Sequence, residues 1–311
     1  MRSSKGYKRS YETYLATDLY GKLTQKNTRG LTQTPTSPLT GLVGGYSFTD
    51  SDAAAYVAAI ETEGATPTDD QKEAIDTFFV NAKDTGYYTS LYRLYLPIWG
   101  AAAPNAKCLV SLTSATFTGS FTHASGYVNP TSVSAANQFV LNYSLLDDDA
   151  TEEDAHLMGL AYDDTSPQDR GIPDANQTLI GSGPITSVSI RINSTSSGVR
   201  PQACWLGANQ APGSIGSHGV MIADRLSGTT ALHKLDGSGG SDTTNTASLT
   251  GTYPNYPLIG FGSAGSGSSV YQPTNAKAGA LGVGLGLGFS DRVSYAGHIK
   301  TLWETCTGLS L

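Results

Sequence analysis

The densest group of side chains that could do chemistry is an acidic stretch near the middle of the chain. It contains Asp147, Asp148, Asp149, Glu152, Glu153 and Asp154, and His156 follows it. Calcium prefers carboxylate oxygens, so a candidate calcium loop would use Asp147, Asp149, Glu152 and Asp154, with Asp163 and Asp164 close by. The stretch lacks the central glycine and the ligand spacing of an EF-hand loop. A solvated surface loop accounts for the same residues, and we predict no bound metal and no cofactor.

Hydrolysis of a polysaccharide is the second chemistry to consider. Most enzymes of this kind place two carboxylates about 5 to 9.5 Å apart across a cleft. One strand can supply such a pair at every second position, because those side chains point to the same face. No predicted strand contains E-x-D-x-E, and the carboxylates collect in loops. We therefore predict a protein that is not an enzyme, with a polysaccharide depolymerase as the alternative.

Motifs of nucleophilic, metal-dependent and nucleotide chemistry are missing from the sequence. No two histidines have H-x-x-x-H or H-E-x-x-H spacing, and G-x-S-x-G is absent. The segment GLGLG at 284–288 keeps its glycines two apart, whereas the dinucleotide fingerprint is G-x-G-x-x-G between a strand and a helix. We expect surface or hydrogen-bonded roles for His123, His156, His218, His233 and His298.

Aromatic side chains in loops could bind sugars by stacking. Trp205 and the segment TYPNYP, which contains Tyr253 and Tyr256, are the candidate glycan contacts. The tyrosines at positions 87, 88, 92 and 95 lie in or beside a predicted helical segment, so we expect them in the core or in an interface.

The first 30 residues differ in charge from the rest of the chain. Seven cations stand against two carboxylates, a net charge of +5, so the remaining residues carry −12. Three interpretations are open: an unstructured tail, a segment that binds nucleic acid through phosphates and stacking, and an arm that becomes ordered on an acidic protein surface. We expect the third, because aromatic and arginine side chains anchor interfaces. The docking residues would be Arg2, Lys5, Tyr7, Lys8, Arg9, Tyr11, Tyr14, Tyr20, Lys22, Lys26 and Arg29.

The elements that must position these residues include a distinctive strand, GALGVGLGLGF at 279–289. Large apolar residues alternate there with Gly282, Gly284, Gly286 and Gly288. A period of two is that of a β-strand. The bare glycine face predicts close approach by another layer, within the domain or from a neighbouring subunit. Only 14% of the residues are charged and 36 are glycines, which favours an all-β sandwich with long loops.

The sequence divides into three predicted parts. Residues 1–45 form the arm and a linker rich in Pro, Thr and Gly. Residues 46–100 form a small helical subdomain: one helix begins near Asp50, a second begins at the capping box of Thr68 and Gln71, and a short helical segment at 90–96 stops before Pro97. Residues 101–311 form the sandwich and a closing helix. Its expected strands are 107–113, 137–144, 156–162, 187–193, 219–225, 229–235, 257–262 and the glycine-alternating segment.

Neither a disulfide framework nor a membrane segment is indicated. The three cysteines, Cys108, Cys204 and Cys306, are widely spaced and form no C-x-x-C motif, so we expect them in the core. The N-terminus lacks the apolar core of a signal peptide, and no run of 18 apolar residues occurs. The sequence therefore predicts synthesis and folding in a cytoplasm.

Three segments of the second half follow one another in a recognisable order: HGVMIADRLSGTTALHKLDG, PNYPLIGFGSAG and LGFSDRVSYAGHIKTLWETC. This order resembles the concanavalin A-like (laminin-G-like) jelly-roll modules of tailed-bacteriophage virion proteins. The positions that fit the pattern are Arg225, Asp236, Gly237, Leu258, Ile259, Gly260, Arg292, Gly297 and Trp303. The resemblance covers about residues 46–311 and brings no catalytic motif and no sugar-binding residue with it.

The resemblance implies adhesion, carbohydrate contact or decoration of a virion. We predict a mainly β, antiparallel jelly-roll β-sandwich with a small helical subdomain and an extended N-terminal arm. We expect a virion structural protein, a tail- or baseplate-associated fibre or adhesin, whose arm binds other virion proteins. Copies of itself and a host-surface glycan would be further partners, and nucleic acid would not be one. A capsid decoration or head-fibre protein, a polysaccharide depolymerase and a free lectin remain the alternatives.

Overall fold

The computed structural model divides the chain into two compact units, Met1–Gly45 and Tyr46–Leu311. It describes residues 14–17, 23–26, 46–132, 134, 136–143, 154–162, 177–182, 188–195, 198–205, 218–237, 239–249, 258–261, 263–264, 270–271 and 276–311. In the first unit these residues form an antiparallel pair, β1 (Tyr14–Thr17) and β2 (Leu23–Lys26). The side chains predicted to dock the arm lie outside the part of the chain that the structure describes.

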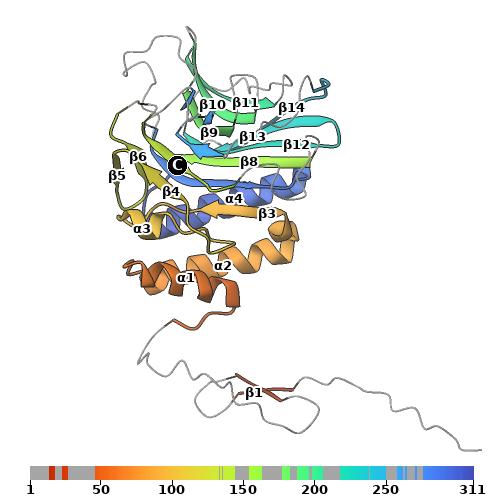
Figure 1. Cartoon of the computed structure of the whole chain (residues 1–311). Coiled ribbons are helices and arrows are strands. Elements are labelled where there is room, and N and C mark those ends of the chain that lie inside the picture. The colour runs from red at the N-terminus through yellow and green to blue at the C-terminus, as the bar shows by residue number, and fades with distance from the viewer. Residues whose placement is uncertain are drawn as a thin grey trace, which may run out of the picture. The chain divides into compact units, whose positions relative to one another are not determined.

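Two antiparallel sheets face each other in the second unit (Figure 1). The first contains β4 (Thr116–Thr118), β7 (Gln138–Val140), β9 (Gln177–Ser182), β10 (Val188–Thr195), β11 (Gly198–Trp205), β15 (Ile259–Gly260), β16 (Ser263–Ala264) and β17 (Val270–Tyr271). Its order is β11-β10-β9-β15-β7-β4, with β16 joining β9 through a parallel bridge and β17 pairing with β16.

The second sheet carries the elements that matter for the site. It contains β3 (Leu91–Tyr95), β5 (Phe121–His123), β6 (Val128–Pro130), β8 (Asp154–Ala161), β12 (Gly219–Leu226), β13 (Thr229–Asp236), β14 (Gly239–Asn245) and β18 (Ala278–Gly284). Its order is β14-β13-β12-β8-β18-β6-β5, and β3 also pairs with β18. The predicted mainly β, antiparallel sandwich is confirmed. Membership of the concanavalin A-like family stays a prediction.

Alternate residues of the central strands face different layers, as the period of two requires. One set lies in the core between the two sheets and includes Leu157, Ala223, Leu281, Phe139 and Ile190. The other set points outward from the second sheet and includes Met158, Leu160, Val220, Ile222 and Ala280. The second sheet is therefore covered on both faces.

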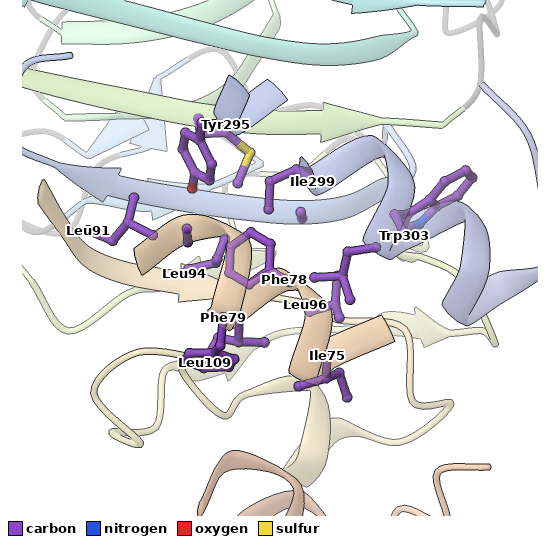
Figure 2. Packing of buried hydrophobic residues seen from close by; sticks show 14 of the residues in the cluster. Ile75, Phe78, Phe79, Leu91, Leu94, Leu96, Leu109, Tyr295, Ile299 and Trp303 are labelled. Atoms are coloured by element: carbon purple, nitrogen blue, oxygen red, sulfur yellow. The ribbon is translucent and has the colours of Figure 1, made fainter. Parts of the chain in front are cut away.

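A layer of helices covers that outer face (Figure 1). It is built from α1 (Ser51–Thr62), α2 (Asp69–Thr85) and α4 (Phe289–Thr307), with the short η1 (Tyr87–Ser90) and α3 (Ala102–Asn105) beside them. Figure 2 shows how side chains of α2 and α4 meet those of β3 in this core. Asp50 caps α1, and Thr68 and Gln71 form the predicted capping box of α2.

The glycine row of β18 fits against its neighbours inside the domain. A Cβ on Gly282 would lie 3.0 Å from the hydroxyl of Tyr295 in α4, and a Cβ on Gly284 would collide with the carbonyl of Ser90. Glycine is needed at these positions because other groups approach the backbone closely. The second layer expected from the sequence is therefore supplied from within the same chain.

Two predicted elements differ from the structure. Residues 90–96 were expected to be helical, but β3 forms there and pairs with β18. Pairing along the free edge of β18 outweighs the weak local helical pattern. Residues 107–113 were expected to be a strand, but they form a turn flanked by isolated bridges, Tyr95 with Cys108 and Lys107 with Ser114.

Candidate functional site

A groove runs between α2 and α4 on the solvent side of the helical layer. It has a volume of about 370 Å³, within the range of small-molecule sites. Its lining residues from α2 are Asp70, Glu73, Ala74, Thr77, Phe78 and Asn81, and those from α4 are His298, Thr301, Leu302 and Thr305. The two sets recur at three- and four-residue intervals, so each is one face of its helix.

Contacts at its two ends fix the groove. Near the start of α2, the side-chain amide of Gln71 donates a 2.6 Å hydrogen bond to the carbonyl of Cys306, close to the end of α4. Beyond the other end of α2, the hydroxyl of Tyr87 lies 2.8 Å from Nδ1 of His298. The start of one helix thus meets the end of the other. The helices are antiparallel, and the groove walls cannot slide past each other without breaking these bonds.

The lining combines carboxylates, hydroxyls, an amide and an imidazole. Burial lowers the pKa of His298 below its ordinary value, so this ring is neutral near pH 7 and can exchange hydrogen bonds with a ligand. Phe78 and Leu302 close the floor, but each is only 2% exposed. The groove therefore presents both hydrogen-bonding groups and apolar carbon surface to a ligand, and the apolar share is the larger.

An ion cluster beneath the helical layer holds α4 on the sheet. Arg292, in the first turn of α4, donates to Asp224 at 2.7 Å and to the carbonyl of Leu287 at 2.8 Å. The same guanidinium reaches Asp242 of β14 at 3.2 Å. Asp224 also accepts a 2.7 Å bond from the Leu287 N–H. A buried arginine with planar, fixed donors suits this double pairing, and it anchors the helix that forms one groove wall.

Burial perturbs the acids and bases of this cluster. Desolvation raises the pKa of Asp224 to about 7, although the Leu287 N–H and Arg292 favour the charged form. Desolvation lowers the pKa of His156 to about 4, against the effect of its bond to the Leu285 carbonyl. Asp224 and His156 face each other across β12 and β8. Both are fully buried, so they cannot touch a ligand and serve the fold.

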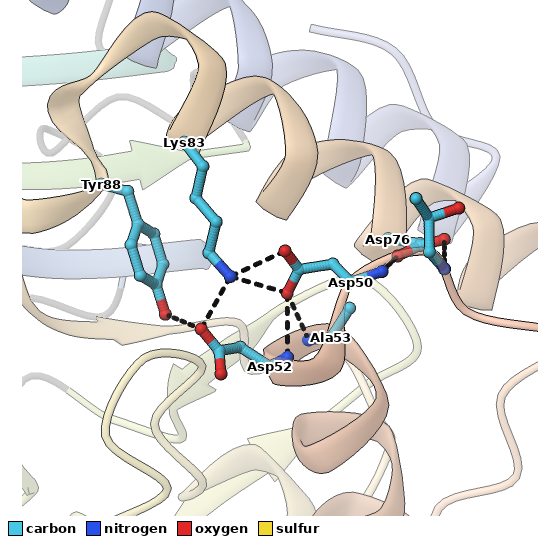
Figure 3. A network of polar contacts seen from close by, with 7 residues as sticks. Asp50, Asp52, Ala53, Asp76, Lys83 and Tyr88 are labelled. Carbon is cyan, nitrogen blue, oxygen red and sulfur yellow. Dashed lines mark hydrogen bonds and ion pairs between the residues drawn. The ribbon is translucent and has the colours of Figure 1, made fainter. Parts of the chain in front are cut away.

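A second polar network fixes the start of the second unit (Figure 3). Asp76 of α2 accepts bonds from the Tyr46 hydroxyl and from the N–H groups of Thr49 and Asp50, at 2.8–2.9 Å. Lys83 binds Asp50 at 2.7 Å and Asp52 at 2.8 Å. The bond from Lys83 is the main cause of the lowered pKa of Asp52. These contacts join residues 46–52 to α2.

Of the predicted site residues, the structure places few. Asp147, Asp149, Glu152, Tyr253 and Tyr256 lie outside the described residues, as does the side chain of Trp205. Asp154 is described: its carboxylate accepts a 2.7 Å bond from the Gly286 N–H and so helps to fix the turn after β18. In the described part of the chain, no group of three or more potential metal-ligating side chains comes together.

The sequence did not indicate the groove. Thr77, Thr301 and Thr305 are ordinary exposed residues of amphipathic helices, and Asn81 is a half-buried one. The spacing of Asp70, Glu73, Thr77 and Asn81 could have shown that they share one face of α2. Nothing in the sequence indicates that this face lies beside α4, which is more than 200 residues further along the chain.

Comparison with known proteins gives neighbours only by structure. No protein-family model matches the sequence, and no curated protein matches it. A Trypanosoma rangeli sialidase mutant with trans-sialidase activity is similar at 10% identity and a TM-score of 0.43, over 73% of this chain and 39% of that one. The enzymatically active domain of tailspike protein 2 from bacteriophage CBA120 is similar at 12% identity and a TM-score of 0.36, over 64% and 30%.

A third neighbour is the CBM40 of the Ruminococcus gnavus IT-sialidase, bound to α2,3-sialyllactose, at 15% identity and a TM-score of 0.25. It aligns with 45% of this chain and 79% of that one. This chain spans only about two fifths or less of the sialidase and tailspike chains. At these values the similarity transfers no residue to this chain.

The prediction of a protein that is not an enzyme is wrong on this comparison, because the neighbours are described as sialidases and an enzymatically active tailspike domain. Two carboxylates on one strand are not a general requirement, because some glycoside hydrolases use a tyrosine nucleophile. Carboxylates can also come from elements other than strands, and Asp70 and Glu73 of α2 both line the groove.

In the part of the chain that the structure describes, no helix is long and apolar enough to cross a bilayer.

Proposed function

We propose that this chain is a tail-associated component of a bacteriophage virion that engages a carbohydrate on the host surface through the α2–α4 groove. The observation that carries the proposal is the groove itself: a concave site on two anchored helices with a lining rich in hydroxyl, amide and carboxylate groups. Sugars present vicinal hydroxyls, which such donors and acceptors match.

The location in a virion rests on the resemblance of residues 46–311 to phage jelly-roll modules and on the separate basic segment at 1–30. This segment has a net charge of +5, whereas the compact second unit is acidic. Such a basic segment suits an arm that binds acidic neighbours in a particle. A cryo-electron microscopy map of the particle would test this part. Density for the second unit at the tail supports the proposal, and density on the capsid lattice favours a decoration protein instead.

The carbohydrate part is tested by filling the groove. Thr301→Trp places an indole between the helices, and Val293→Trp on the same helix is the control, since Val293 is exposed and lies outside the groove. Binding to a glycan array from the host surface should fall at least about tenfold for Thr301→Trp, a loss of about 1.4 kcal/mol, and stay unchanged for Val293→Trp. Equal binding by both variants contradicts the proposal.

Cleavage of the bound polysaccharide is a second candidate function, favoured by one observation. Asp70 and Glu73 both line the groove, and residues three apart on a helix have Cβ atoms about 5 to 6 Å apart. Two carboxylates on such neighbouring side chains can adopt the separation of about 5 Å found between the two carboxyl groups of a retaining glycoside hydrolase.

Release of reducing ends from the host polysaccharide tests this function. Asp70→Asn and Glu73→Gln should each reduce the rate of release of reducing ends at least about a hundredfold, which is the scale of general acid–base catalysis. Asp84→Asn, an exposed acid of α2 outside the groove, is the matched control. Unchanged release in the first two variants would exclude these carboxylates.

A further inference from the structure

The charge of the groove indicates which class of glycan it takes. Among its described lining residues, Asp70 and Glu73 are anionic and none is Lys or Arg. His298 adds no charge near pH 7, because burial lowers its pKa and Nδ1 pairs with the hydroxyl of Tyr87. The groove lining therefore carries a local charge of about −2 from these two carboxylates.

The cations of the two helices are committed elsewhere. Lys72 pairs with Glu61 at 2.8 Å, and Lys83 pairs with Asp50 and Asp52. Arg292 lies under the helices with Asp224 and Asp242. Lys300 pairs with Glu304. These four are the Lys and Arg residues of α2 and α4, so neither helix supplies a counter-ion for Asp70 or Glu73.

The rest of the lining favours a sugar over a peptide. A peptide in a groove between helices is held by apolar anchors in apolar pockets, but Phe78 and Leu302 are almost completely covered by their own neighbours. The accessible lining combines the short polar side chains of Thr77, Asn81, Thr301 and Thr305 with a larger area of apolar carbon surface. The polar groups can exchange hydrogen bonds with the hydroxyls of a sugar.

We infer that the α2–α4 groove selects a glycan that carries free amines, with its ammonium groups at Asp70 and Glu73 and its hydroxyls at the threonines and Asn81. The inference rests on the proposed function and adds the charge class of the ligand. It also excludes an anionic glycan, such as a sialylated or uronic acid chain, because two uncompensated carboxylates repel it. Exposed charge pairs contribute about 0.2 to 1 kcal/mol each, so two pairs give a preference of roughly 2- to 30-fold.

The experiment measures binding of three oligosaccharides of equal length to the full chain by calorimetry. The probes are glucosamine, N-acetylglucosamine and galacturonic acid oligomers, which are cationic, neutral and anionic. The expected affinity order is cationic, then neutral, then anionic. The spread should shrink in high salt, because exposed charges are screened. The double variant Asp70→Asn/Glu73→Gln should bind the cationic and neutral oligomers equally, and Asp84→Asn should behave as the unmodified chain.

Several results would overturn the inference. One such result is an affinity for the anionic oligomer equal to that for the cationic one. Another is a preference for the cationic oligomer that persists in the double variant. Oligolysine binding as tightly as the glucosamine oligomer would show that the groove takes a basic peptide. If Thr301→Trp abolishes binding of host glycan while no amine preference exists, the inference fails and the proposed function stands. If Thr301→Trp leaves host glycan binding intact, the proposed function fails with it.

Discussion

Replacing His156 by asparagine should change how the stability of the protein depends on pH. His156 is fully buried under the helical layer, and burial lowers its pKa from 6.5 to about 4. Between those two values the unfolded chain binds a proton at this residue and the folded chain does not. The free energy of unfolding therefore decreases as pH falls through this window. At 1.36 kcal/mol per unit, the loss from His156 is about 2 kcal/mol between about pH 7.5 and about pH 5.

Asp224 has the opposite effect, so the unmodified protein alone cannot test this reasoning. Burial raises the pKa of Asp224 from 3.8 to about 7. The folded state therefore binds more protons at this residue between those values, and stability from Asp224 rises as pH falls. The two effects nearly cancel over the same window. The difference between the protein and its His156→Asn variant removes the contribution of Asp224 and of every other shared group.

The assay is urea unfolding of both proteins at about pH 7.5 and about pH 5. Asparagine can donate to the Leu285 carbonyl, as His156 does from Nδ1, but it does not titrate. The stability advantage of the unmodified protein should be about 2 kcal/mol smaller at the lower pH. Because Asp224 faces His156 across the strands, the comparison is repeated with Asp224→Asn in both proteins. An advantage that is the same at both pH values, in both backgrounds, would refute the reasoning.

Four further substitutions test the packing that positions the groove. Gly284→Ala should destabilise the protein by about 3 kcal/mol or more, because the added Cβ collides with a backbone carbonyl. Gly297→Ala should stabilise it by about 0.5 to 1 kcal/mol, because a Cβ added at Gly297 in α4 has no other atom within 4 Å. Thermal unfolding of the two variants measures both effects. Arg292→Met removes the cation that pairs with the buried Asp224 and the half-buried Asp242 and should cost about 3 to 5 kcal/mol in urea unfolding. The loss should be smaller near pH 5, where Asp224 is protonated; an equal loss at both pH values contradicts this. Asp76→Asn weakens three hydrogen bonds to a buried carboxylate and should lower the free energy of unfolding by about 2 kcal/mol. A change below about 0.5 kcal/mol, as expected of a surface residue, would show that the network is dispensable.

Local signals in the sequence predicted the helices and central strands. The capping box of Thr68 and Gln71 and the helix end at Gly86 are short-range features, set by backbone groups within a few residues. The alternation in β12 also predicted a strand, and it indicates a buried charge as well. It places Asp224 on the same face as Val220 and Ile222, and a carboxylate among buried apolar residues requires a partner. That partner, Arg292, could not be identified because it is 68 residues away.

The groove could not be predicted because it depends on which faces of two distant helices come together. Most of its residues on α2 and α4 are polar and at least partly exposed, which is the usual pattern for the solvent side of an amphipathic helix. The structure of residues 90–96 also depends on a partner that is distant in the sequence. Leu91, Leu94 and Tyr95 are all buried in a spacing that also suits a helix, and only the pairing of β3 with β18 decides for a strand.

The glycine row and the groove are connected through α4. A Cβ on Gly279 would collide with the indole of Trp303, and Gly282 leaves room for Tyr295. The bare face of β18 therefore lets one face of α4 sit close to the sheet, where Trp303 also donates a 2.7 Å bond to the Gly126 carbonyl. His298, Thr301 and Thr305 follow on the adjoining face of the same helix and meet α2. Because this packing fixes the distance between α4 and the sheet, the polar face of α4 lies beside the polar face of α2. A side chain added to the glycine row should alter ligand binding in the groove even where the protein still folds.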